Sequence, residues 1–406
     1  MIKKIGVESL KKGMFIHDLN CSWLDHDFVS NSLKINDDKT IKKIIEIGIR
    51  ELYIDTEKGV DVSTGVPAEE VKHDLDTAMG RLAANVEGKK AHPIEKEMQK
   101  AKALQREADK VISEFMSDAK MGKAPELGKV EEVVSKMVDS IYRNKDALEH
   151  LGKIRTKDEY TFKHSLNVCI LMVSFCKGMK VSIEDTKLVG VGALLHDVGK
   201  MLVPDEILNK PTALTEVEYQ TMKEHVIRGE ELLRKSEGIS EISVAIATQH
   251  HERYDGTGYP HGLKNDTITT YGQMASIVDV YDAITADRVY HKGLRSFEGL
   301  RKLLEWSNHH FNPTLVQHFI RAVGVYPAGT LVKLESGLLA IVVEQGEKSL
   351  SLPVIKIVYD SKKERFITPF KVKLEYPPAR MGEDRIIGTE IPERWGIKME
   401  DYAEIY

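Results

Sequence analysis

The stretch ALLHDVGKMLVPDEIL (residues 193–208) places His196 and Asp197 directly after an apolar helical run. A buried carboxylate costs several kcal/mol unless it is paired or coordinates an ion. Three other His-Asp dipeptides, at 17–18, 26–27 and 73–74, lie in polar surroundings and are expected at the surface. Its apolar context therefore distinguishes the pair at 196–197 as a candidate for metal chemistry.

Other polar residues interrupt apolar helical surroundings in the same part of the chain: His164, His225, His250, His251 and Asp279. Each of them alone is more often a hydrogen-bonded core histidine or a salt-bridged aspartate. Together and unpaired, they would cost more than the stability of a domain, which is about 5–15 kcal/mol. Five histidines and two aspartates on different helices therefore predict a pocket that holds two divalent ions, with Asp197 as the bridge.

The types of donor narrow the choice of metal and of reaction. Imidazole and carboxylate without thiolate suit Fe, Mn, Co, Ni or Zn better than Ca or Mg. Two ions about 3.5–4 Å apart hydrolyse phosphoesters, because they lower the pKa of a bridging water and clamp phosphate oxygens. Lys200 follows Asp197 closely and could stabilise charge on a phosphate. Alternatively, Lys200 is a helix C-terminal cation that the macrodipole favours.

Three motifs occur in order along this region: HDVGK (196–200), GYP within HHERYDGTGYP (250–260), and DVYDAITADRVY (279–290). With them, residues from about 155 to 320 resemble the HD-GYP family of the HD phosphohydrolase superfamily. Its members are all-helical, metal-dependent phosphodiesterases that hydrolyse the bacterial second messenger cyclic di-GMP. The resemblance implies attack by a metal-bridging hydroxide and formation of linear pGpG, with a second round to GMP left open.

The resemblance also implies how the ligands divide. One metal would be held by Asp197, His225, His250 and His251, and the other by His164, His196, Asp197 and Asp279. Some members bind a third metal through a glutamate four residues before the first histidine. Tyr160 occupies that position here, after Asp158 and Glu159. We therefore expect two divalent ions, with Fe or Mn favoured over Ni, Co or Zn.

Further residues match family positions that contact the substrate. Arg288 matches an arginine that contacts phosphate, and Lys292 stands one position beyond the usual second basic residue, where this chain has His291. Tyr259 and Asp282 match residues that line the site. Lys200 and Asp197 are the predicted catalytic residues.

The GYP segment has the composition of a tight loop. Gly256, after Asp255, and Gly258 permit turns that need a positive φ, and Pro260 restricts the residue before it to an extended conformation. Such a loop would expose the Tyr259 ring to a guanine or a ribose-phosphate, although a tyrosine there could equally pack the loop itself.

Two other functions stay open at this point. The chain could hydrolyse another cyclic dinucleotide or a nucleotide, or it could be a non-catalytic module that binds cyclic di-GMP or a partner protein. The presence of all seven ligand positions favours a hydrolase.

The elements that must position these residues predict a mainly α protein. Residues 151–323 form helix after helix, with capping patterns at Ser182 and Thr215, and predict an all-helical HD-type catalytic domain. Residues 1–64 predict a small α+β regulatory module, and residues 65–150 predict charged connecting helices. Their apolar stripe at 130–141 either packs within the chain or forms a dimer seam. Residues 324–406 predict a small β-rich module, with strands in 326–375 and an irregular tail.

The overall composition limits the partners. The 406 residues carry a net charge of −5 and are 42% hydrophobic, which is typical of a soluble globular protein of two or three domains. Neither a nucleic-acid polymer nor an anionic membrane is expected as a partner, and no apolar run reaches the roughly 20 residues of a membrane span. Cys21, Cys169 and Cys176 form no disulfide pattern, so we expect a cytoplasmic protein. A homodimer and signalling partner proteins remain open.

Overall fold

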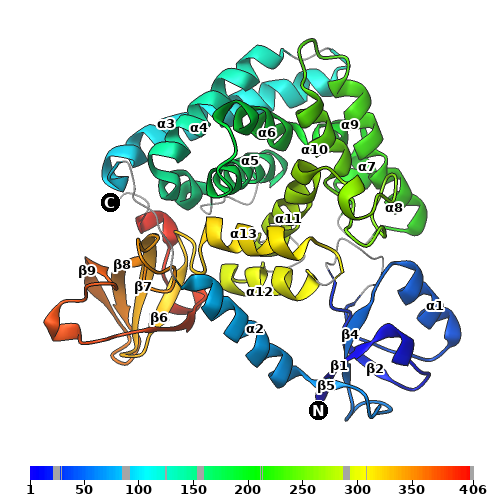
Figure 1. Cartoon of the computed structure of the whole chain (residues 1–406), viewed down its shortest axis with the longest axis horizontal. Coiled ribbons are helices and arrows are strands. Elements are labelled where there is room, and N and C mark those ends of the chain that lie inside the picture. The colour runs from blue at the N-terminus through cyan, green and yellow to red at the C-terminus, as the bar shows by residue number, and fades with distance from the viewer. Residues whose placement is uncertain are drawn as a thin grey trace.

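A computed structural model describes residues 1–21, 28, 30–84, 92–123, 126–152, 160–210, 212, 214–286, 293–307 and 309–402. A body of helices forms the main part of the molecule, and two small sheets lie apart from each other along its lower side (Figure 1). The chain is mainly α-helical, with a small α+β region at its start and a small β-rich region at its end, as the sequence predicts.

The N-terminal module is a five-stranded antiparallel sheet with one helix. Its strands have the order β3-β2-β4-β1-β5. They are β1 (Ile2–Gly6), β2 (Phe15–Asp18), β3 (Leu33–Lys34), β4 (Glu51–Asp55) and β5 (Val66–Pro67). Helix α1 (Asp38–Glu46) begins at Asp37, whose carboxylate accepts a hydrogen bond of 2.8 Å from the Thr40 backbone N–H. Gly48, with a φ of +84°, then turns the chain into β4.

The predicted catalytic domain is a bundle of helices around one apolar core. It contains α5 (Tyr160–Gly178), α6 (Ile183–Leu195), η3 (Val198–Leu202), α7 (Asp205–Leu208), α8 (Glu216–Lys223), α9 (His225–Leu233), α10 (Glu241–Gln249), η4 (Asn265–Thr267), α11 (Thr270–Thr285), α12 (Ser296–Trp306) and α13 (Pro313–Val323). Both predicted caps are present: the Ser182 hydroxyl accepts from the Asp185 N–H at 3.0 Å, and Thr215 and Glu218 form a full capping box.

Two long connecting helices belong to the same core. Helices α3 (Ile94–Lys120) and α4 (Leu127–Gly152) pack against each other and against α5. The apolar stripe of α4 is at most 1% exposed and joins the core of the catalytic helices; its residues are Val130, Val133, Val134, Met137 and Ile141. The stripe therefore packs within the chain and cannot serve as a dimer seam.

Helix α2 (Ala68–Ala83) runs between the two sheets (Figure 1). It packs against α12 and α13, and its buried residues, Met79, Leu82 and Ala83, lie near its end. Near its end, the Ala83 carbonyl accepts a hydrogen bond of 3.0 Å from the Leu350 backbone N–H of the C-terminal module. One helix thus contacts both flanking modules and the catalytic body.

The C-terminal module is a five-stranded antiparallel sheet in the order β10-β6-β7-β8-β9. Its strands are β6 (Leu331–Leu334), β7 (Leu338–Glu344), β8 (Val354–Asp360), β9 (Arg365–Lys373) and β10 (Ile386–Thr389). The prediction of an irregular tail was wrong for β10, which pairs with β6. The strand is short and carries a register shift between Ile386 and Gly388, so it lacks a clear alternating pattern.

Two predictions from composition can be compared with the structure. All three cysteines are buried, and within the described residues none of them forms a disulfide. Among the helices of the described ranges, none combines the length and the hydropathy needed to cross a bilayer.

Candidate metal centre

Seven polar side chains meet within the helical body, five of them at helix ends and two, His164 and Asp279, within helices. His164 lies on α5 and Asp279 on α11, while His225 is the first residue of α9. His196 and His250 are the C-caps of the apolar helices α6 and α10, and Asp197 and His251 directly follow them. Because the second halves of α6 and α10 are largely buried, their last residues emerge inside the protein rather than at its surface.

The ligand atoms of these side chains fall into two groups, each with all its atoms within 4.8 Å of one another. The first group contains Asp197, His225, His250 and His251, and the second contains His164, His196 and Asp279. Six of the seven residues are at most 5% exposed, whereas the side chain of His251 is 19% exposed. The structure therefore brings together every ligand position predicted from the sequence and leaves one edge of the centre open.

Asp197 lies between the two groups. Its Oδ2 is 3.4 Å from His196 Nε2 and 3.6 Å from His164 Nε2. Its Oδ1 is 3.4 Å from His225 Nε2 and 3.7 Å from His250 Nε2. One carboxylate thus presents a separate oxygen to each group, which is the geometry that a bridging ligand needs.

Hydrogen bonds on the far side of the imidazole rings fix their orientation. The Nδ1 atoms of His196, His225 and His250 donate to carbonyl oxygens three residues earlier, at 2.7–2.8 Å. Since a carbonyl only accepts, the proton lies on Nδ1 and the Nε2 lone pair points to the centre. His164 instead contacts a carboxylate, with 2.8 Å between its Nδ1 and Asp282 Oδ2.

The charges of the centre favour a cation. Burial lowers the pKa of His225 to about 4 and that of His250 to about 3, so both rings are neutral near pH 7. Burial would raise the pKa of Asp197, but the nearby Lys200 and His196 hold it well below its usual value. For His196, the charge of Asp197 outweighs burial and raises the pKa to about 10. The carboxylates thus place negative charge at the centre, which a divalent cation would balance.

Unsatisfied atoms also indicate room for an ion. Within the part of the chain that the structure describes, His196 Nε2 and Asp197 Oδ1 are buried without a hydrogen-bond partner. Native proteins rarely leave such atoms unpaired. Neutral imidazoles and carboxylates in these positions suit divalent metal binding, because each has a lone pair directed at the same volume.

A glycine contact sets the spacing between η3 and α9. A Cβ on Gly199 would lie 1.9 Å from the His225 carbonyl oxygen and 2.5 Å from the Gly229 nitrogen. Only glycine at position 199 permits this approach, which brings Asp197 and His225 together. The next residue, Lys200, points back to the centre and places its Nζ 2.5 Å from Asp197 Oδ2, with 25% of its side chain exposed.

The GYP loop (residues 252–263) forms one wall of the open edge. The Tyr259 ring stacks on His251, with 4.7 Å between ring centroids and an interplanar angle of 26°. The Tyr259 N–H donates to the His251 carbonyl at 3.1 Å, and the peptide bond from Tyr259 to Pro260 is cis. The ring predicted to meet the substrate therefore lies directly against a candidate metal ligand.

The two glycines of this loop have different roles. Gly256 has a φ of +84°, as predicted. The prediction of a positive φ at Gly258 was wrong, since Gly258 is not among the positive-φ residues. Its lack of a side chain is needed for a close approach instead: a Cβ would lie 2.3 Å from the Arg253 nitrogen and 2.5 Å from the His251 carbonyl oxygen.

Sequence reasoning missed two residues of this site. Glu252 is 1% exposed and accepts hydrogen bonds from the backbone N–H groups of His261 and Leu263 at 2.8 and 2.9 Å, which closes the GYP loop. Lys223 places its Nζ 5.5 Å from the centroid of the Tyr259 ring. An acid next to two histidines was a signal for Glu252, whereas Lys223 resembles any other helix lysine.

The remaining predicted residues have different outcomes. Asp282 is 2% exposed and faces His164, which favours orientation of that ring over the predicted contact with substrate. Arg288 and Lys292 lie outside the described residues, as do Asp158, Glu159 and the dipeptide at 26–27. His17, His73 and Asp74 are exposed, as expected, whereas Asp18 is half-buried and its Oδ2 lies 3.4 Å from Lys302 Nζ on α12.

The helical body and its paired histidine–aspartate groups define an HD-domain protein. Residues 146–315 match the family model described as an HD domain, and residues 2–130 match a domain of unknown function. The second match spans the N-terminal module, α2 and α3 and reaches the start of α4.

The chain is also similar to individual proteins. It is 36% identical over 405 residues to the cyclic di-GMP phosphodiesterase PA4108 of Pseudomonas aeruginosa, which covers 99% of this chain and 95% of that protein. It is 31% identical over 193 residues to the 3'3'-cGAMP-specific phosphodiesterase 2 of Vibrio cholerae, across 47% of this chain and 37% of that protein. Among solved structures, a HDG"Y"P protein from Bdellovibrio bacteriovorus is 18% identical, with a TM-score of 0.47 over 79% of this chain and 98% of that chain. The full-length similarity shows that the chain belongs to the HD-GYP family of the HD phosphohydrolase superfamily.

Proposed function

We propose that this protein is a metal-dependent phosphodiesterase that hydrolyses cyclic di-GMP to linear pGpG. The observation that carries the proposal is the pair of ligand groups with the Asp197 carboxylate between them. It occurs in a chain that aligns over 99% of its length with a cyclic di-GMP phosphodiesterase. The fold alone would not suffice, because one fold hosts many activities. Further hydrolysis of pGpG to GMP extends the same proposal.

We assign the two metals to the two groups. Asp197, His225, His250 and His251 would hold one ion, and His164, His196, Asp197 and Asp279 the other, with iron or manganese favoured. When bound, two such ions lower the pKa of a water molecule and polarise a phosphate oxygen. Asp282 accepts a hydrogen bond from His164 Nδ1, so Nε2 is the atom of this ring that would hold the second ion.

The rim of the centre supplies the contacts to the substrate. Lys200 carries a positive charge beside Asp197 and can stabilise negative charge on the reacting phosphate. The Tyr259 ring offers a stacking surface for a guanine, and Lys223 beside it offers a charge for the second phosphate. Arg288 and Lys292 remain proposed phosphate contacts from the segment at 287–292.

A second substrate deserves a direct comparison. A relative that shares 31% identity over 193 residues is named a 3'3'-cGAMP-specific phosphodiesterase. The two cyclic dinucleotides differ in one base, so the metal centre would treat their phosphates alike. Discrimination would depend on the wall that contains Tyr259.

The deciding experiment uses the purified full chain, loaded with Mn²⁺ or with Fe²⁺ under anaerobic conditions. Cyclic di-GMP and 3'3'-cGAMP are supplied separately, and products are separated by liquid chromatography. We expect pGpG from cyclic di-GMP, loss of turnover after chelation, and recovery when metal returns. Tight binding of cyclic di-GMP by the metal-loaded protein without any product would contradict the proposal and favour a binding module. Faster cleavage of 3'3'-cGAMP would reassign the substrate.

A further inference from the structure

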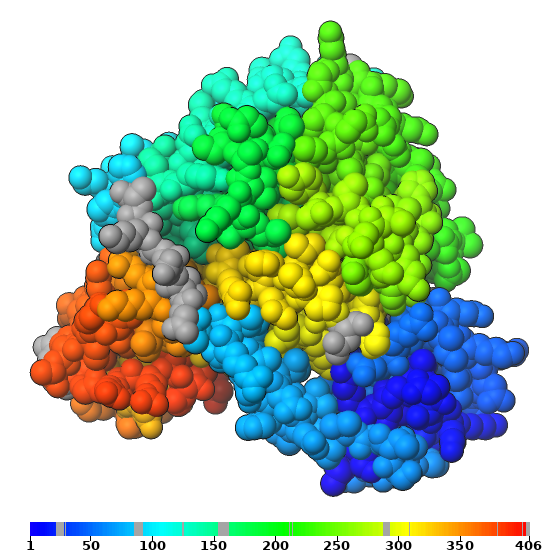
Figure 2. Space-filling view, in the orientation of Figure 1, coloured from blue at the N-terminus to red at the C-terminus, as the bar shows by residue number. Residues whose placement is uncertain are grey.

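The N-terminal module reaches the GYP loop, although the two are far apart in sequence. Gly48 lies against Thr257: a Cβ on Gly48 would be 2.8 Å from Thr257 Cβ and 2.9 Å from its Oγ1. The module and the catalytic body abut one another in the space-filling view, where blue meets yellow and green (Figure 2). The contact is therefore close enough that a side chain on Gly48 would displace the loop.

A charge pair accompanies this contact. Arg50 Nε is 3.7 Å from Asp255 Oδ2, with 49% of the arginine side chain and 14% of the aspartate side chain exposed. The other oxygen, Asp255 Oδ1, accepts hydrogen bonds from the Thr257 N–H at 3.0 Å and from its hydroxyl at 2.6 Å. Asp255 Oδ2 is buried and has no hydrogen-bond partner among the described residues. Arg50 is thus the cation that faces this buried oxygen.

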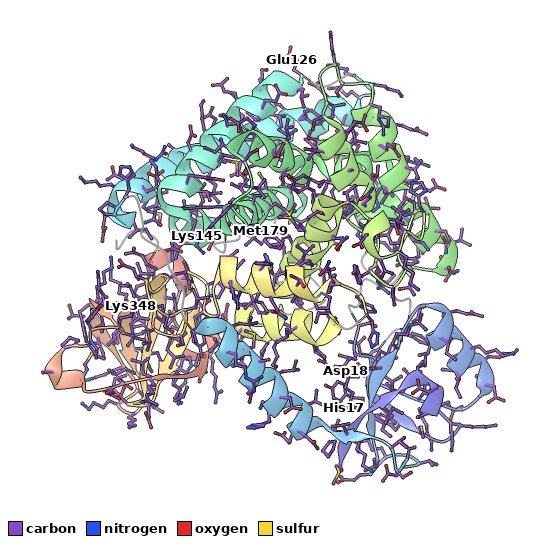
Figure 3. All side chains as sticks on the ribbon, viewed as in Figure 1. His17, Asp18, Glu126, Lys145, Met179 and Lys348 are labelled. Carbon is purple, nitrogen blue, oxygen red and sulfur yellow. The ribbon has the colours of Figure 1, made fainter. Side chains whose placement is uncertain are left out.

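The module is fixed where it meets the loop. The Arg50 carbonyl accepts a hydrogen bond of 2.8 Å from the Val7 N–H, which ties its backbone to the sheet. Asn20 Oδ1 accepts from Lys302 at 2.9 Å and from Trp306 at 3.1 Å, both on α12. Asp18, which is labelled in Figure 3, is also near α12: its Oδ2 accepts a hydrogen bond of 3.4 Å from Lys302. The position of Arg50 is therefore set by the fold and not by a mobile tail.

The GYP loop connects the contacts of the N-terminal module to the metal centre. Thr257 is followed directly by Gly258, which is wedged against the His251 carbonyl, and by Tyr259, whose ring stacks on His251. On its other side, the loop is held by the hydrogen bond of 2.9 Å from the Tyr254 N–H to the His310 carbonyl. A shift at Thr257 would therefore move the Tyr259 ring relative to the candidate metal ligand.

We propose that Gly48 and Arg50 of the N-terminal module are positioning residues for the substrate, because they hold the GYP loop and its Tyr259 ring against the metal centre. The kinetic consequence rests on the proposed function, whereas the order of the loop does not. The module thereby contributes to substrate binding without touching the reacting atoms.

The test compares Arg50→Ala, Arg50→Glu and Arg50→Lys with Lys42→Ala, which removes a charge from an exposed position on α1. Hydrogen exchange is followed by mass spectrometry in peptides that cover residues 253–260 and in α10 as a reference. An exposed ion pair is worth at most about 1 kcal/mol, so Arg50→Ala should raise exchange in the loop and KM for cyclic di-GMP about 2- to 5-fold. Arg50→Glu adds repulsion and should raise KM about 10-fold.

Other readouts separate positioning from a general loss of structure. Metal content, kcat and hydrolysis of bis(p-nitrophenyl) phosphate, which is too small to need the loop, should stay unchanged, and Arg50→Lys should restore most of the effect. The inference is overturned if Arg50→Ala and Arg50→Glu match Lys42→Ala in loop exchange and in KM, or if they lose metal and kcat instead. If the unchanged protein does not hydrolyse cyclic di-GMP, the proposed function fails, and loop exchange alone still decides the role of Arg50.

Discussion

The metal centre and the GYP loop meet at His251, but they are held in place by different means. The metal centre is built mostly from helix ends inside one core, and three of its imidazoles donate to carbonyls three residues earlier in the chain. The GYP loop is closed by the buried Glu252 and is contacted from outside by a module that begins the chain. The metal centre therefore depends on local helix structure, whereas the GYP loop also depends on distant parts of the sequence.

This difference separates two properties of the protein. Changes in the helix ends should alter metal content and the rate of the chemical step together. Changes around the GYP loop should alter the affinity for the dinucleotide and leave the metals in place. The predictions below test that separation, from the largest effect on turnover to the smallest.

Asp197→Ala should remove both metals and lower turnover by at least about a thousandfold, because several kcal/mol of transition-state stabilisation depend on the ions. Elemental analysis and product formation would be measured on the same sample. Asp205→Ala is the matched control, since Asp205 is an exposed aspartate paired with Lys120. If the Asp197→Ala protein kept both metals, the assignment of Asp197 as a ligand of the metal centre would be wrong.

Asp282→Asn should weaken metal binding by about 10- to 100-fold, because a carboxylate behind a ligating histidine raises its basicity. Titration with Mn²⁺ would measure the affinity, and saturating metal should restore most of the turnover with KM for the dinucleotide unchanged. A raised KM at saturating metal would instead return Asp282 to the role in substrate binding that the sequence suggested.

Lys223→Ala should raise KM for cyclic di-GMP about 3- to 10-fold through the loss of a charge beside Tyr259. Metal content should be that of the unchanged protein, which elemental analysis would verify. Lys223→Arg provides the matched charge. If Lys223→Ala changed kcat alone, Lys223 would act on the chemical step and not, as proposed, on the affinity for the dinucleotide.

Glu305→Gln should hardly change turnover but should lower the free energy of unfolding at pH 6.5 by about 1–3 kcal/mol. Burial would raise the pKa of Glu305, but Lys302 and Lys4 and a hydrogen bond from Tyr53 hold it below its usual 4.5. The carboxylate therefore stabilises the folded chain above pH 4.5, and this contribution is lost as the pH falls through the lowered pKa.

Urea unfolding at several pH values between 6.5 and 4 would measure this effect. The difference in stability between the unchanged protein and Glu305→Gln should begin to shrink below pH 4.5. A difference that stays constant across this range would mean that the charge of Glu305 contributes nothing to the contact between the N-terminal module and α12.

The sequence predicts the meeting of the candidate ligands because each one interrupts an apolar helical run. His196 and Asp197 follow the buried residues of α6, and His250 follows those of α10, so burial and polarity conflict at positions that a linear reading can find. The helical core, the two helix caps and most strands of the two small sheets have similarly local signals. The stripe on α4 was visible as well, although its partner was not.

Contacts between distant segments were not predictable in this way. Arg50 and Lys223 have the same residue types and local patterns as many solvated positions, and only the fold brings them to Asp255 and Tyr259. The need for glycine at 258 was read as a backbone angle, whereas it arises from the approach of another segment of main chain. Strand β10 was missed because a short strand with a register shift carries no period of its own.

The contact between Gly199 and α9 has a consequence for how this centre could change over time. The main chain at Gly199 contacts the main-chain carbonyl of His225 directly, so no side chain lies between them whose size a mutation could change. The separation of Asp197 from His225 is therefore inherited by any variant that folds, while the rim residues are free to diversify. A change of substrate would therefore arise from substitutions at the rim, whereas the spacing of the metal ligands would be kept or lost as a whole.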